Sequence, residues 1–126
     1  MWRYGKGSRA ERELLNKFKQ HGFIVVRAAG SGFEGPDIIA IKGGKEYAIE
    51  CKAQEAGTLS IGKEQFENLV KWQENSLMQV YVAWKKSHLG WFFIPLSAFE
   101  KKKVNYGIKF EKAVAVAYKL EDLLFA

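Results

Sequence analysis

The chain has 126 residues, of which 48% are hydrophobic and 27% charged, and this fits a single globular domain with no room for a second. A net charge of +6 favours a polyanionic partner such as nucleic acid, because basic surfaces gain contacts with phosphates. The single cysteine, Cys51, excludes an internal disulfide and a cysteine-cluster zinc site. The lack of a long apolar run or a signal peptide predicts an intracellular, cytoplasmic protein without a membrane segment.

Apolar periodicity predicts helices and strands along the whole chain. In chain order, the expected elements are a helix over Ser8 to His21, strands at Phe23 to Ala28, Asp37 to Lys42 and Glu46 to Ala53, a loop from Gln54 to Ser60, a helix at Gly62 to Glu74, strands at Met78 to Lys85 and Trp91 to Pro95, a terminal strand at Ala113 to Tyr118, and a short helix at Glu121 to Phe125. The run Trp91 to Ile94 lacks polar alternation, so it is either a central strand buried on both faces, which we favour, or a strand whose outer face is covered by a partner subunit. This order predicts one α/β domain over residues 1–126, with a central mixed β-sheet flanked by α-helices.

Two carboxylates and a lysine are predicted to meet in this sheet. Gly43-Gly44 forms a hairpin turn between the second and third strands, so Asp37, at the far end from that turn, comes level with Glu50. Side chains alternate between the faces of a strand, so Glu50 and Lys52 share a face. Asp37 is one of only two aspartates in the chain. The pattern Pro-Asp, strand, Glu-x-Lys has the spacing of a metal-dependent nuclease.

Two carboxylates at a strand end repel one another unless a cation neutralises them. Oxygen ligands with room for water suit Mg²⁺, and Mn²⁺ can substitute for it. A bound metal would polarise a phosphate and activate a water, while Lys52 would orient that water or stabilise the charge that develops. The structural alternative is that Asp37 merely begins a strand after a turn and that Glu50 and Lys52 line a solvated sheet face.

Further charged residues lie near this pattern in the expected fold. Glu11 shares a helical stripe with Leu15 and Phe18, so it borders the buried face of the first helix. It is therefore either a third carboxylate that approaches the cluster or an ordinary glutamate at a helix boundary. Arg12 and Arg27 add guanidinium groups, whose fork of donors matches the geometry of phosphate.

Four segments stand in a fixed order along the chain: Gly7-Ser8-Arg9-Ala10-Glu11-Arg12-Glu13-Leu14, Gly22-Phe23-Ile24-Val25-Val26-Arg27, Pro36-Asp37-Ile38-Ile39-Ala40 and Ile49-Glu50-Cys51-Lys52. In this order they resemble the archaeal-type Holliday junction resolvases, members of the restriction-endonuclease-like PD-(D/E)xK nuclease superfamily. The resemblance covers most of the chain, and the ordered set is more specific than any one segment. One departure is Cys51, which stands where an aliphatic residue is usual; cysteine behaves as a small buried apolar residue and should be tolerated there.

The resemblance implies a restriction-endonuclease-like fold and a homodimer that grips a four-way DNA junction in recombination and repair. It implies paired, Mg²⁺-dependent nicks in opposing strands near the branch point. The implied catalytic set is Glu11, Asp37, Glu50 and Lys52, and the implied metal ligands are Glu11, Asp37, Glu50 and the backbone carbonyl of Cys51. The candidate DNA contacts are Arg12, Arg27, Ser31 in the glycine-rich segment before Pro36, Lys63 at the start of the second helix, and Lys85 after an apolar strand.

Three other functions remain open on the sequence. The chain could be a nuclease of the same superfamily with a restriction or mismatch target, a non-catalytic junction-binding protein that has kept a nuclease scaffold, or an RNA-binding α/β protein. A non-catalytic binder would gain from losing carboxylates that repel phosphate. The chain also lacks the paired aromatic sheet signature of the commonest RNA-binding modules. The residues therefore favour a nuclease, and the resemblance implies that its target is a four-way junction.

Overall fold

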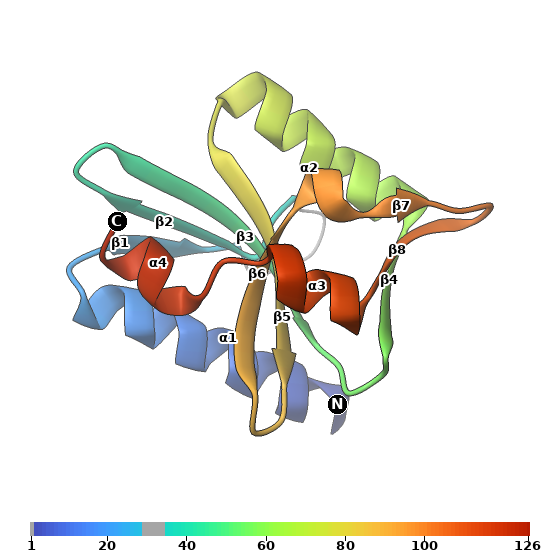
Figure 1. Cartoon of the computed structure of the whole chain (residues 1–126). Coiled ribbons are helices and arrows are strands. Elements are labelled where there is room, and N and C mark those ends of the chain that lie inside the picture. The colour runs from blue at the N-terminus through green and yellow to red at the C-terminus, as the bar shows by residue number, and fades with distance from the viewer. Residues whose placement is uncertain (1, 29–34) are drawn as a thin grey trace.

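The structure is a computed structural model that describes residues 2–28 and 35–126, with side chains from Arg9 onward. A five-stranded mixed sheet in the order β1-β2-β3-β5-β6 forms its centre, and a three-stranded sheet, β4-β8-β7, lies beside it (Figure 1). In chain order, the elements are α1 (Trp2–Gln20), β1 (Ile24–Arg27), β2 (Ile38–Lys42), β3 (Lys45–Ala53), β4 (Thr58–Gly62), α2 (Lys63–Ser76), β5 (Gln79–Lys86), β6 (Gly90–Pro95), the 3₁₀ turn η1 (Leu96–Ala98), β7 (Glu100–Lys101), β8 (Asn105–Lys109), α3 (Phe110–Val116) and α4 (Leu120–Leu124). The predicted α/β fold with a central mixed sheet is confirmed.

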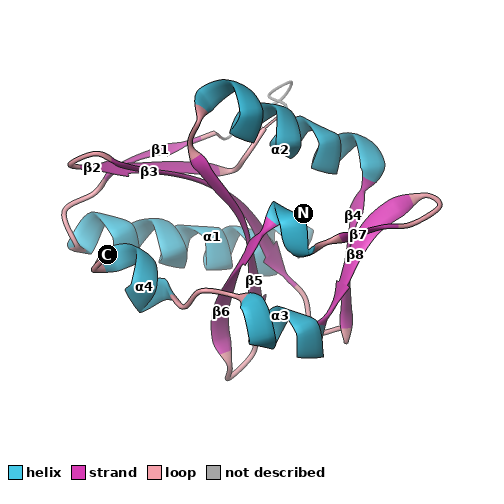
Figure 2. Ribbon diagram, turned by 45° about the horizontal axis from the view of Figure 1, so that its top comes forward, coloured by secondary structure: helices cyan, strands magenta, loops and turns pink. Residues whose placement is uncertain are grey.

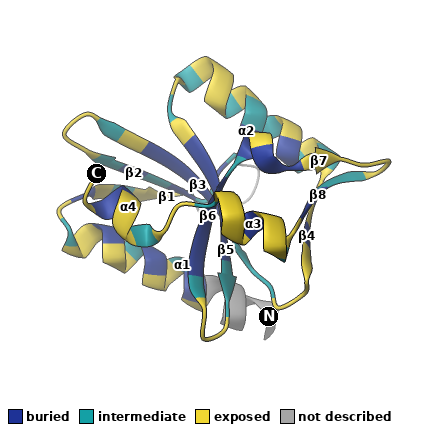
Figure 3. Cartoon of the chain, viewed as in Figure 1, coloured by how far each residue is buried: buried dark blue, intermediate teal, exposed yellow. Residues whose placement is uncertain are grey.

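Helices α1 and α2 cover opposite faces of the central sheet (Figure 2). On the α1 side, Leu14 and Phe18 are fully buried in one apolar cluster with Ile49 of β3. On the α2 side, Phe66 and Leu69 belong to a second cluster with residues of β5. Strands β3 and β5 pair in parallel between the two clusters and are largely buried (Figure 3). Burial on both faces fixes the direction of every side chain along these two strands.

The predicted and observed boundaries agree within two residues for β1, β2, β3, α2, β5, β6 and α4. Helix α1 begins earlier than predicted, at Trp2 rather than Ser8. The glycines at positions 5 and 7 hide the helical pattern in the sequence. A helical glycine costs about 1 kcal/mol relative to alanine but does not end a helix, so α1 extends through both positions.

The predicted loop from Gln54 to Ser60 is wrong in its second half, because β4 begins at Thr58. Leu59 and Ile61 point into the second apolar cluster and are fully buried, while their neighbours along the strand are exposed. This short alternation is a strand pattern. Strand β4 runs directly into α2, and the two together form one unit on the α2 face of the central sheet.

The predicted terminal strand at Ala113 to Tyr118 is also wrong, because most of it is the helix α3. The alternating alanines and valines indicate a strand by composition, yet burial follows a helical period. Ala113 is fully buried and Phe110 packs against the same cluster, whereas Val114 is 49% exposed. Tertiary packing of a small residue therefore outweighs the β-propensity of the valines.

Strand β6 is an edge strand of the central sheet, and it is buried on both faces. The predicted burial of Trp91 to Ile94 is confirmed, but the predicted central position is wrong, because β6 lies at the edge of the sheet. The backbone of Phe93 exchanges two hydrogen bonds of 2.9 Å with Tyr118, the only isolated β-bridge among the described residues. The chain segment between α3 and α4 thus covers part of the β6 edge.

No helix within residues 2–28 and 35–126 has the length and apolar character needed to cross a membrane.

Candidate active site

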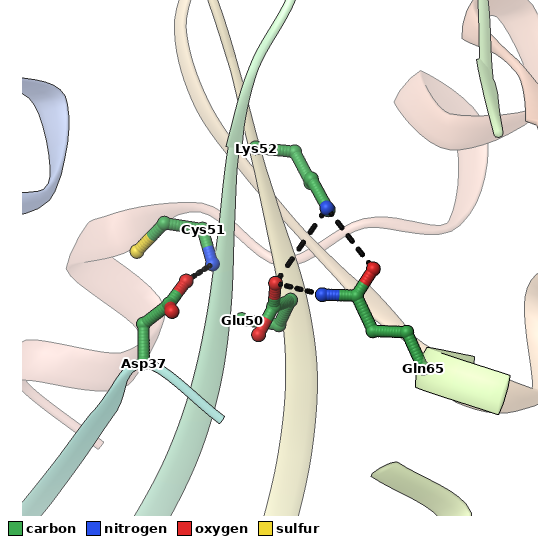
Figure 4. Close-up of polar contacts among 5 residues, drawn as sticks. All are labelled: Asp37, Glu50, Cys51, Lys52 and Gln65. Atoms are coloured by element: carbon green, nitrogen blue, oxygen red, sulfur yellow. Dashed lines mark hydrogen bonds and ion pairs between the residues drawn. The ribbon is translucent and has the colours of Figure 1, made fainter. Parts of the chain in front are cut away.

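Asp37, just before the start of β2, lies opposite Glu50 in the neighbouring strand β3. In the antiparallel pairing of β2 with β3, Ile38 lies opposite Ile49, so one further step of the same register places Asp37 opposite Glu50. The backbone N–H of Asp37 donates to the Ile49 carbonyl at 2.9 Å, and the N–H of Cys51 donates to Asp37 Oδ2 at 2.9 Å (Figure 4). Two hydrogen bonds with the backbone of β3 therefore hold Asp37 in place. Its position level with Glu50 is the one that the hairpin at Gly43-Gly44 predicts.

Glu50 is the one charged residue among the described side chains that is buried, with 4% of its surface exposed. Its Oε2 atom accepts a hydrogen bond of 2.7 Å from the side-chain amide of Gln65 and lies 3.6 Å from Lys52 Nζ (Figure 4). Its Oε1 atom is buried and has no hydrogen-bond partner within the described part of the chain. A buried carboxylate oxygen without a partner is costly, and such an atom in a native fold calls for a ligand.

Burial, as the largest cause, and the nearby charge of Asp37 together raise the pKa of Glu50 to about 8, although Lys52 opposes the shift. Burial also raises the pKa of Asp37, although the hydrogen bond from the Cys51 N–H lowers it in part. The charge of Asp37 thus makes Glu50 harder to ionise, and the charge of Glu11 does the same to Asp37. A cation between Asp37 and Glu50 would remove this repulsion and favour the ionised form of both.

The donor set fits a hard divalent cation. Asp37 and Glu50 supply two carboxylates, and Oε1 of Glu50 has no hydrogen-bond partner in the described part of the chain. Many proteins hold Mg²⁺ in this way, by one or two carboxylates, while waters and substrate phosphates complete its ligands. Within the described residues, no three His, Cys, Asp or Glu side chains are grouped so that they could hold a metal on their own. The site therefore offers a partial ligand set that water and phosphate would complete.

Glu11 lies at the margin of this site and forms an ion pair with Arg27. Its Oε2 atom forms an ion pair with Nε of Arg27, the last residue of β1. Glu11 is close enough to Asp37 and Glu50 that its charge raises the pKa of both. The structure thus brings Glu11 near the two other carboxylates, and its role as a metal ligand stays a prediction.

Lys52 shares a face with Glu50, as the strand alternation predicts, and its ammonium group lies beside the carboxylate. Burial holds the pKa of the Cys51 thiol well above its usual value, so the thiol is neutral. The thiol side of Cys51 packs with the α1-side apolar cluster. The backbone carbonyl of Cys51 remains the predicted ligand.

Of the candidate DNA contacts, Arg12 and Lys85 lie close together. Arg12 is exposed and lines a surface cavity of about 520 Å³, together with Lys85, which is ion-paired with Glu13. Neither Asp37 nor Glu50 lines that cavity. Lys63 begins α2 and donates to the Lys103 carbonyl at 3.4 Å, and Ser31 lies outside the described residues. Lys63 does not line the cavity that Arg12 and Lys85 share.

Gln65 is the site residue that the sequence interpretation missed. It stands four residues before Leu69 and seven before Trp72, so it shares the stripe of α2 that faces the sheet. A polar residue on an apolar helical stripe is a signal for a buried polar contact. That signal is visible in the sequence, but it does not say which strand residues Gln65 meets.

The comparisons with known proteins agree with this geometry. Residues 2–126 match a family model described as archaeal Holliday junction resolvase (hjc). The chain is 36% identical over 106 residues to the crossover junction endodeoxyribonuclease Hjc of Archaeoglobus fulgidus, covering 82% of this chain and 78% of the relative. It is 32% identical over 124 residues to the enzyme of the same name from Sulfurisphaera tokodaii, covering 94% and 85%. The solved structure of A. fulgidus Hjc, a Holliday junction resolvase, superimposes with a TM-score of 0.84 at 30% identity, covering 94% of this chain and 95% of that one.

Proposed function

The chain belongs to the archaeal Holliday junction resolvase family, and from this premise we propose that it resolves four-way DNA junctions by hydrolysing phosphodiester bonds near the branch point. The observation that carries the chemistry is the buried, unpartnered Oε1 of Glu50 beside Asp37. The comparisons support a nuclease with a divalent-metal requirement. The choice of Mg²⁺, the paired nicks, the homodimer and the cytoplasmic location are the finer parts of the proposal.

Asp37 and Glu50 would hold the metal, and Glu11 and the carbonyl of Cys51 are the further candidate ligands. When bound, the ion supplies Lewis-acid polarisation of the scissile phosphate and makes water a better nucleophile at neutral pH. Lys52 places a positive charge beside this centre, where it donates hydrogen bonds to the attacking water or to the phosphate oxygens as negative charge builds on them. Glu11 is paired with Arg27, so a DNA phosphate that binds Arg27 would free the Glu11 carboxylate for the site.

Two equivalent strands must be cut for a junction to resolve symmetrically, and a twofold dimer presents two identical sites in the matching arrangement. We therefore include a homodimer in the proposal. Light scattering of the purified protein tests it, and a monomer that still makes both nicks in one binding event would contradict it.

The function is tested with a labelled immobile four-way junction in Mg²⁺ and in EDTA, with cuts mapped on all four strands. Wild type is expected to make paired, metal-dependent nicks in opposing strands. Asp37→Asn is expected to bind the junction with unchanged affinity and to leave it uncut, because the substitution removes a ligand charge without removing volume. Asp122→Asn, at the other aspartate of the chain, is the matched control and should cut normally.

The outcomes separate the remaining functions. Cuts of equal efficiency on plain duplex of the same sequence would assign the protein to another nuclease class. Tight binding without any cut in Mg²⁺ or Mn²⁺ would indicate a non-catalytic junction-binding protein. Loss of junction binding in Asp37→Asn would show that this variant has a folding or general charge defect, and Glu50→Gln would then replace it.

A further inference from the structure

Gln65 joins the two halves of the candidate active site. Its side-chain amide donates to Glu50 Oε2 at 2.7 Å, and its side-chain oxygen accepts a hydrogen bond of 3.2 Å from Lys52 Nζ (Figure 4). A carboxamide has donors at one end and an acceptor at the other. Gln65 is thereby bonded at the same time to a carboxylate and to an ammonium group that are themselves neighbours.

The distance between Lys52 and Glu50 indicates how Gln65 acts. Lys52 Nζ lies 3.6 Å from Glu50 Oε2, whereas an ammonium that donates directly to a carboxylate approaches to about 2.8 Å. The lysine is thus held short of full contact with the glutamate. Without the Gln65 oxygen, Lys52 would be free to close onto Glu50 and bond to its carboxylate.

Gln65 also determines which oxygen of Glu50 is available. Oε2 is taken by the amide, and Oε1 is left buried with no hydrogen-bond partner in the described part of the chain. A cation that reaches this carboxylate meets Oε1 without having to displace a protein donor. The carboxylate is thus oriented before any ligand arrives, which lowers the cost of binding one.

The support for Gln65 is rigid. It lies in the first turn of α2, directly after β4. Ile61 before it and Phe66 and Leu69 after it are buried in the α2-side cluster, and they fix the start of the helix against the sheet. Residues locked by packing in this way are suited to holding catalytic side chains in place.

We infer that Gln65 is a positioning residue, which keeps Lys52 from closing onto Glu50 and leaves Glu50 Oε1 free for a divalent cation. This inference rests on the proposed metal-dependent nuclease function. Groups that orient metal ligands typically contribute 10- to 100-fold to metal affinity or activity. The same range is expected here, although Gln65 itself need not touch metal or DNA.

The first experiment compares Gln65→Met with Gln73→Met, the same change at an exposed position of α2. Mn²⁺ binding is measured without DNA, from the electron paramagnetic resonance signal of the free ion. Gln65→Met should weaken Mn²⁺ binding by about 10- to 100-fold, and Gln73→Met should leave it unchanged. Both variants should stay folded and keep the junction affinity of wild type in EDTA. Gln65→Asn, whose shorter side chain cannot reach both partners, replaces Gln65→Met if that variant does not fold.

The second experiment asks whether Gln65 acts through Lys52. In a Lys52→Met background no ammonium can close onto Glu50, so adding Gln65→Met should cost much less Mn²⁺ affinity than it does in wild type. An equal loss in both backgrounds, or no loss in either, would overturn the inference. The Mn²⁺ measurements are made without DNA, so they test the role of Gln65 separately from junction cutting. A wild type that cuts no junction would contradict the proposed function and not the role of Gln65.

Discussion

At the residue scale, Glu50 is the one charged side chain in the described part of the chain that is buried. A carboxylate with one oxygen bonded to an amide and the other unpartnered must lose its proton before it can bind a cation. The register of a hairpin and the alternation of a strand were enough to place Asp37, Glu50 and Lys52 together from the sequence. They could not show that Glu50 is buried, because its burial comes from α2 and β5, which are distant in the sequence.

The raised pKa of Glu50 predicts a pH-dependent metal affinity. Its pKa of about 8 means that, below pH 8, a proton competes with the cation for the carboxylate. Apparent Mn²⁺ affinity should therefore rise by up to about tenfold per pH unit as pH rises toward 8, and then level off. Titrations at pH 6, 7, 8 and 9 measure this, with inert buffers and constant ionic strength. A pH-independent affinity would contradict the assignment of Glu50 as a ligand.

The same shift predicts how the stability of the metal-free protein changes with pH. The pKa of Glu50 is raised from 4.5 to about 8 on folding, so the folded state holds a proton that the unfolded state has lost. The resulting stability is fully present below pH 4.5 and is lost as pH rises through 8. The slope is at most about 1.4 kcal/mol per pH unit. Urea unfolding in EDTA should show this decline in wild type and a flatter dependence in Glu50→Gln; parallel curves would refute it.

At the element scale, the sequence predicted the five strands of the central sheet well, but it did not predict β4 or α3. Strands β2 and β3 have a glycine turn and clear apolar runs. Strand β4 has only two inward residues, Leu59 and Ile61, so its alternation is too short to stand out from a loop. In α3 the valines indicate a strand, and only contact with the second cluster shows that Ala113 is the buried residue.

A substitution at the exposed residue Val114 can distinguish the helix α3 from a strand. Val114 is 49% exposed, so its contribution to stability is mostly conformational. Alanine is favoured over valine in a helix by roughly half a kcal/mol, whereas valine is favoured in a strand. Val114→Ala should therefore raise the free energy of unfolding slightly. Ala113→Val, at the buried neighbour, should lower it by about 1–3 kcal/mol through overpacking. A destabilising Val114→Ala in urea unfolding would argue against the helix.

At the scale of the whole molecule, the net charge of +6 favours association with DNA. The acidic site, in contrast, serves the hydrolysis proposed above. The carboxylates repel phosphate, so binding must come from basic residues elsewhere on the surface. The candidates are spread over α1, the end of β5 and the start of α2. Sequence patterns identify such residues individually but do not give their arrangement, since each lies on a different element.

Salt dependence tests one of these contacts. Each phosphate contact contributes roughly 0.9 to the slope of log affinity against log salt. Arg12→Ala should weaken junction binding in EDTA and reduce that slope by about one. Lys19→Ala is the matched control, because Lys19 is exposed and lies at the C-terminal end of α1. It should leave the slope unchanged. A slope that Arg12→Ala does not alter would remove Arg12 from the DNA-binding surface.

The β-bridge between Phe93 and Tyr118 has a consequence for self-association in the cell. Strand β6 carries four consecutive large apolar residues along an edge of the sheet, and such an edge is a template on which other chains can add strands. The segment around Tyr118 occupies part of that template. Detaching the segment around Tyr118 would uncover this part of the β6 edge. We expect such a variant to add strands between chains more readily than wild type.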